Sequence, residues 1–125
     1  MSAAGDKLRV TFRPVLGPPL RALRLLLAAR QLVRATRHET DAGACFDAVM
    51  SSDLFRPLQR RAEFLALLRR AADGRPSVIL EIGSAAGGTA FLWTRIAAGD
   101  ALLILVDDTF GAARRAALRR FARGR

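Results

Sequence analysis

Two short apolar runs, separated by a glycine-rich segment, limit this chain to few folds. The first run covers residues 78–82 and contains one acid, Glu81, and the second covers residues 101–106 and is followed by Asp107 and Asp108. Between them, residues 89–98 have the spacing of a helix. Two buried strands joined by one helix form a parallel βαβ unit. The sequence therefore predicts an α/β fold in which both strands end at the same edge of a sheet.

The segment that follows the first predicted strand has the composition of a ligand-binding turn. A glycine directly after the strand permits a sharp turn, small residues let a ligand approach the backbone, and glycines at the start of the helix leave N–H groups accessible. An acid at the tip of the second strand can accept hydrogen bonds from both hydroxyls of a ribose. The candidate binding residues are Glu81, Gly83, Ser84, Ala85, Gly87, Gly88, Thr89 and Asp107.

Three ligands compete for this turn. A phosphate-binding P-loop requires a lysine after its glycines, and none follows Gly88, so a nucleoside triphosphate is disfavoured. A dinucleotide-binding turn follows the pattern G-x-G-x-x-G, whereas the glycines here occupy positions 83, 87 and 88. An acid in the first strand, a looser glycine turn and an acid after the second strand fit S-adenosyl-L-methionine better. A partial NAD-binding domain stays as an alternative.

The segments VILEIGSAAGGTAFLW and LLILVD resemble the class I SAM-dependent methyltransferases. Within that family the sequence is most similar to the branch of cephalosporin-hydroxylase-like and rhamnosyl O-methyltransferase-like proteins, which carry the turn E-x-G-x-x-x-G-G-[ST]. The stretch QRRAEFLALLRRAADGRPSVILEIG also resembles the helix that precedes the first strand in that family. The resemblance covers residues 54–108.

The resemblance implies a truncated Rossmann-like fold and the cofactor-binding half of an enzyme that methylates an oxygen atom of a small molecule or sugar. It implies that residues 83–85 and Gly87 pass under the methionine part of the cofactor. Glu81 would orient the turn or reach the cofactor's amino group through water, and Asp107 would hold the ribose, with Asp108 as the less favoured choice. It assigns no catalytic base, because the family carries its substrate loops on later strands.

The remaining pattern predicts helices around the βαβ unit. Gly17 and the prolines at positions 14, 18 and 19 predict a disordered or loosely docked arm over residues 1–19, followed by a helix at 20–38 and a connector at 40–53. Residues 54–72, with Pro57 in the first turn, and residues 112–122 also have helical spacing. We therefore divide the chain into residues 1–53 and a partial SAM-binding domain at 54–125. No third strand is predicted after residue 121, so we expect half of a larger α/β domain or a domain completed by another subunit.

The strong positive charge indicates an alternative function. The chain has 21 lysines and arginines against 11 acids, a net charge of +10, and Lys7 is its one lysine. This charge reflects either a general preference for arginine or an Arg-rich, non-enzymatic module that binds nucleic acid or an anionic surface. Aromatic residues suited to base stacking are few and no nucleic-acid-binding motif is present, so we expect no dedicated nucleic-acid binding.

Composition also bears on metals, partners and location. One cysteine, Cys45, and one histidine, His38, are too few for an internal disulfide or a zinc site of these residues, and we expect no metal.

No apolar stretch reaches the roughly 20 residues of a membrane span, and no secretory signal is present, so we expect a cytoplasmic protein. The helix predicted at 20–38 has an apolar stripe that includes Ala29 and Leu32, and its other side mixes leucines with arginines. We therefore expect this helix to pack on the core or on a second subunit, which would give a homo-oligomer through this helix.

Overall fold

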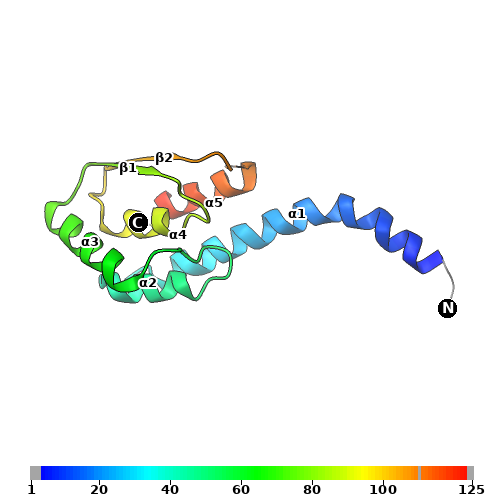
Figure 1. Cartoon of the computed structure of the whole chain (residues 1–125), viewed down its shortest axis with the longest axis horizontal. Helices are drawn as coiled ribbons and strands as arrows, with labels where there is room; N and C mark the ends of the chain where they lie inside the picture. Colours follow the sequence, from blue (N-terminus) through cyan, green and yellow to red (C-terminus); the bar gives the residue numbers. More distant parts are fainter. Residues whose placement is uncertain (1–3, 110, 124–125) are drawn as a thin grey trace.

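The structure, a computed structural model, describes residues 4–109 and 111–123, with side chains from residue 19 onward. Figure 1 shows the described elements in layers, with the sheet uppermost, α4 and α5 beneath it, α1 and α2 beneath those, and α3 at one end. In chain order the elements are α1 (Ala4–Ala35), α2 (Ala42–Met50), α3 (Arg61–Gly74), β1 (Val78–Ile82), α4 (Gly88–Ile96), β2 (Leu102–Val106) and α5 (Ala112–Arg123).

The sheet confirms the predicted βαβ unit. Strands β1 and β2 are parallel, and their register pairs Val78 with Leu102 and Ile82 with Val106. Because successive side chains of a strand point to opposite faces, each strand presents one set of residues to the helices and another set away from them. Leu103 and Leu105 face α4 and α5 across a cavity of about 190 Å³. The chain is therefore a mixed α/β structure with helices on one face of a small parallel sheet.

The hydrophobic core lies between the helices rather than under the sheet. Four phenylalanine side chains from α2, α4, α5 and the segment before α3 are fully buried. The ring of Phe121 makes edge contacts with Phe55 and Phe91, at centroid distances of 5.0 and 5.1 Å. Ala29 and Leu32 of α1 are buried in the same cluster. Residues on both sides of the predicted boundary at position 53 thus contribute to one core.

The prediction of a helix over residues 54–72 is wrong at its N-terminal end, because α3 begins at Arg61. A residue before proline is disfavoured in the helical region, so Pro57 restricts Arg56 to more extended backbone. Phe55 leaves the helical pattern to enter the core, where it contacts Phe121. Leu58, placed on the apolar face by the sequence pattern, is instead exposed.

The prediction that residues 1–19 lack regular structure is wrong for residues 4–19, because the backbone is helical from Ala4 onward, while residues 1–3 lie outside the described part of the chain. Proline fixes φ near −65°, a value that a helix accepts, so a proline within a helix costs a hydrogen bond and a steric adjustment without excluding helical backbone. The N-terminal half of α1 extends away from the remaining elements (Figure 1). Within the described chain, none of the helices has the length and apolar character needed to cross a bilayer.

The predicted connector at 40–53 contains the helix α2. The carboxylate of Asp41 caps it by accepting a hydrogen bond of 2.7 Å from the backbone N–H of Ala44. Such a bond satisfies one of the N–H groups that have no partner within the first helical turn. Cys45, Phe46 and Val49 of α2 then pack into the core beside α4.

Candidate functional site

The turn between β1 and α4 requires glycine at two positions. Gly83 and Gly87 have φ values of 82° and 91°, in the left-handed region that residues with a side chain rarely adopt. Gly83 extends the strand pairing by donating its N–H to the carbonyl of Val106, and Gly87 closes the turn by donating to the carbonyl of Ser84 at 2.7 Å. Ala85 also has a positive φ, of 42°, so the turn holds one residue in an uncommon conformation.

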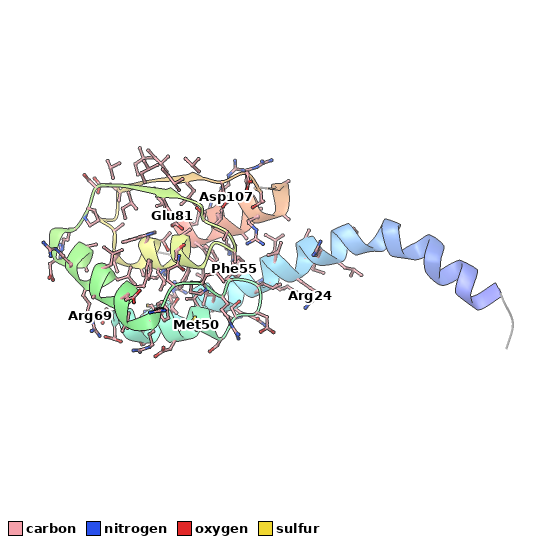
Figure 2. The ribbon with its side chains drawn as sticks, viewed as in Figure 1. Arg24, Met50, Phe55, Arg69, Glu81 and Asp107 are labelled. Atoms are coloured by element: carbon pink, nitrogen blue, oxygen red, sulfur yellow. The ribbon has the colours of Figure 1, made fainter. Side chains whose placement is uncertain are left out.

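Asp107 fixes this strained turn. One carboxylate oxygen, Oδ2, accepts the backbone N–H of Ala85 at 2.7 Å, and Oδ1 accepts the N–H and hydroxyl of Thr109 at 2.9 and 2.5 Å. The hydrogen bonds from Thr109, followed by that from Ala85, lower the pKa of Asp107. The prediction that the glycine turn and this acid lie at the same sheet edge is confirmed, and Figure 2 shows Asp107 beside Glu81 at that edge.

Glu81 and Ser84 each carry a buried oxygen atom that lacks a hydrogen-bond partner among the described residues. The hydroxyl of Thr89 donates to Oε1 of Glu81, which joins the covered face of β1 to the first turn of α4. Within the part of the chain that the structure describes, Oε2 of Glu81 and Oγ of Ser84 have no hydrogen-bond partner. Burial raises the pKa of Glu81, with a smaller contribution in the same direction from the negative charge of Asp107. Unpartnered buried polar atoms are costly and are often found where a ligand binds.

Close packing against neighbouring residues leaves no room for a side chain at Gly87 or Gly88. A Cβ atom on Gly88 would overlap the backbone carbonyl of Phe55, and one on Gly87 would lie 2.9 Å from Cδ2 of Leu118. Both glycines are buried by these neighbours. By contrast, a Cβ atom on Gly83 would meet nothing within 4 Å. The open side of the turn is therefore at Gly83, and the two later glycines seat α4 against the segment before α3 and against α5.

A cavity of about 190 Å³ lies between the turn and the segment that precedes α3. Its walls are formed by Arg56, Pro57, Leu58, Gln59, Gly83, Ser84, Ala85, Ala86, Gly88 and Thr89. Five of the eight sequence-predicted residues line it directly. The other three adjoin it: Glu81 through Thr89, Asp107 through Ala85, and Gly87 through Ser84.

The wall made by residues 56–59 was missed at the sequence level, because those residues were predicted to be helical. Pro57 was the available signal, since it disfavours helical backbone at Arg56. The Nε atom of Arg56 donates to the carbonyl of Met50 at 3.0 Å, and its guanidinium lies 3.8 Å from a carboxylate oxygen of Asp53. These contacts hold a cation at the mouth of the cavity.

The arrangement has the polarity of a binding site for a small ligand with hydroxyl and amino groups. Asp107 offers carboxylate lone pairs beside the turn, while Ser84 and Glu81 offer buried oxygens next to the cavity. Among the described residues, no group of three or more His, Cys, Asp or Glu is placed to hold a metal ion. Comparison with models of protein families, with curated proteins and with solved structures finds no match.

Proposed function

We propose that the turn between β1 and α4 binds S-adenosyl-L-methionine, and that the chain is the cofactor-binding half of a methyltransferase acting on a hydroxyl of a small molecule or sugar. The observation that carries this proposal is the hydrogen bond of 2.7 Å between Asp107 and Ala85, which places a carboxylate at the open side of the glycine turn. The unpartnered oxygens of Ser84 and Glu81 beside the cavity support it.

Each residue has a role that its surroundings allow. The lone pairs of Asp107 that Ala85 and Thr109 leave unused would accept hydrogen bonds from the ribose hydroxyls. The methionine part would lie over the open side of Gly83, and its ammonium group would satisfy the buried oxygen of Ser84 or Glu81. When bound, the cofactor supplies an electrophilic methyl group on a sulfonium. This chain contributes binding and orientation, which are the main demands of methyl transfer.

Isothermal titration calorimetry with S-adenosyl-L-methionine tests the proposal. We expect measurable heat at high micromolar ligand, and a loss of affinity of at least about tenfold in Asp107→Ala, because the ribose loses a charged acceptor. Asp100→Ala is the matched control and should bind as the wild type does, because Asp100 is exposed in the turn before β2, at the opposite end of that strand from Asp107. Circular dichroism must show that each variant is folded.

Two outcomes would contradict this proposal. A folded wild-type chain that gives no heat with S-adenosyl-L-methionine does not bind it. A chain that prefers NAD in a competition titration carries a dinucleotide site instead, as the alternative from the sequence suggested.

One structural observation favours a second candidate function, binding to an anionic surface. The two most arginine-rich helices, α1 and α5, pack against each other, so their exposed arginines lie on neighbouring elements. Arg24, Arg30 and Arg34 are exposed on α1, and Arg119, Arg120 and Arg123 are exposed on α5. Binding to single-stranded RNA, duplex DNA or anionic vesicles should then weaken steeply as salt increases. Absent binding, or binding that salt does not change, would exclude this candidate.

A further inference from the structure

None of the residues that the structure describes covers the face of the sheet that points away from α4 and α5. Its side chains are Val78, Leu80, Ile82, Leu102, Ile104 and Val106, and they are between 40% and 76% exposed. The strand register places them in three opposed pairs, with Leu80 beside Ile104 at the centre. Every member is aliphatic, so this set, the bare sheet face, contains no side chain that water can hydrogen-bond. Sheets that are solvated on one face normally alternate apolar and polar residues.

The size of the bare sheet face distinguishes it from an ordinary surface patch. Six aliphatic residues with these exposed fractions present roughly 600 Å² of apolar surface, which is at the upper limit for the largest patch of a monomer. Two such faces packed together would remove roughly 1,200 Å² from water, the lower bound for a stable, specific protein interface. The area is therefore sufficient for a second copy of this chain to cover it, with modest affinity.

We propose that the chain forms a twofold symmetric dimer in which the bare sheet faces of two copies pack against each other. A twofold interface uses the same surface on both partners, so the surface must be self-complementary. Two pleated, uniformly aliphatic faces meet this condition, because their side chains can interdigitate at a sheet separation of about 10 Å. The proposal does not depend on cofactor binding at the glycine turn.

The distribution of charge favours this face over the contact through α1 that the sequence suggested. On α1 the exposed leucines Leu20, Leu23 and Leu27 lie among Arg24, Arg30 and Arg34. Packing two such helices together would bring arginines of both copies close, and the chain already carries a net charge of +10. The bare sheet face carries no charge, and α1 lies on the far side of α4 and α5 from it (Figure 1).

Sedimentation velocity of the full chain over a concentration series tests the dimer. We expect a monomer–dimer equilibrium that is weak enough to follow over this series, because interfaces near the lower size limit are typically transient. Leu80→Glu should raise its dissociation constant at least about 100-fold, because it places an unpaired carboxylate at the centre of the interface. Leu27→Glu is the matched control on α1 and should leave the dissociation constant unchanged. A monomeric wild type, or a dimer that Leu27→Glu abolishes and Leu80→Glu preserves, would overturn the proposal.

If Leu80→Glu fails to fold, a cross-linking experiment tests the proposed dimer instead. A cysteine introduced by Leu80→Cys would lie close to the twofold axis, and the opposed sheets would be about 10 Å apart, within reach of a short bismaleimide. We expect covalent dimers of Leu80→Cys and none of Leu67→Cys, which places a thiol on α3 at an exposed leucine of similar exposure. The native Cys45 is buried and does not compete. Absence of covalent dimers of Leu80→Cys would contradict the proposed interface.

Discussion

Two carboxylates at the glycine turn differ because their surroundings differ. Asp107 accepts hydrogen bonds from Thr109 and Ala85, and its pKa is lowered. Glu81 is half-buried, its Oε2 atom has no hydrogen-bond partner among the described residues, and its pKa is raised. The sequence predicted both positions, because acids adjoining two apolar runs are visible in the residue order. It could not predict their partners, since Ala85 and Thr109 approach Asp107 only after the chain has turned.

At residue scale, the raised pKa of Glu81 predicts a pH dependence of stability. The unfolded glutamate loses its proton near its ordinary pKa of about 4.3, while the folded one retains it to higher pH. Between these two values the folded state binds more protons than the unfolded state, so the free energy of unfolding decreases as pH rises. Above the pKa that Glu81 has in the folded state, the free energy of unfolding no longer changes with pH through this residue.

Glu81→Gln removes this titration and should make the corresponding part of the pH profile flatter. Urea unfolding of the wild type and of Glu81→Gln across the acidic to neutral range measures the difference between the two proteins. Asp107 contributes in the opposite direction, because its lowered pKa gives stability that is lost as pH falls. That contribution is common to both proteins apart from its interaction with the charge of Glu81. A difference that does not change with pH would show that Glu81 titrates alike in the folded and unfolded states.

At the scale of elements, the site depends on the contact between α4 and the segment before α3. The sequence predicted β1, α4, β2 and α5 to within one or two residues, because each has a clear local period bounded by glycine or acid. It misassigned residues 54–60, where apolar residues at helical spacing outweighed the effect of Pro57. Phe55 is buried through contacts with α4 and α5, and no local pattern records contacts of that kind.

The close approach of Phe55 to α4 predicts a large effect of Gly88→Ala. The added methyl group would overlap the carbonyl oxygen of Phe55 and lie 3.1 Å from Cδ of Pro57. Overpacking against backbone should reduce the free energy of unfolding by about 2–3 kcal/mol. Gly74→Ala is the matched control, because a methyl group at Gly74 meets nothing within 4 Å, and it should be neutral or stabilise by up to about 1 kcal/mol.

Chemical unfolding monitored by circular dichroism compares these two variants with the wild type. The contrary result, Gly88→Ala with wild-type stability, would mean that residues 54–60 shift away at little cost. In that case the cavity wall formed by residues 56–59 would be a movable element.

At the scale of the whole molecule, the sequence predicted which helices and strands form but not how they pack into layers. The apolar stripe of α1 predicted a buried face, and Ala29 and Leu32 are indeed buried. Neither the packing of α1 along α5 nor that of α2 along α4 follows from local periodicity, because both are contacts between distant segments. The result is a helical core with a sheet on its surface, and this arrangement leaves the outer sheet face bare.

The net charge of +10 predicts that salt stabilises the fold. Like charges repel in the compact state, and added salt screens that repulsion. Salt also weakens the exposed ion pairs of Arg56 with Asp53 and of Arg60 with Glu63, which contribute little. The bidentate pair of Arg61 with Asp47 is also exposed, and it is a single pair against a net charge of +10. The repulsion should therefore dominate.

The thermal midpoint should rise by roughly 3–6 °C, equivalent to about 1 kcal/mol, between low and physiological salt. The matched control replaces three exposed arginines, Arg24 and Arg30 of α1 and Arg69 of α3, with glutamate, and Figure 2 shows Arg24 and Arg69 far apart. Each replacement lowers the charge by two, so +10 becomes +4, and the rise should shrink accordingly. Thermal unfolding at low protein concentration keeps dimer formation from contributing. If the midpoint instead falls as salt increases, attraction between specific charges outweighs the net repulsion. The arginines of α1 and α5 would then be paired mainly with acids of this same chain.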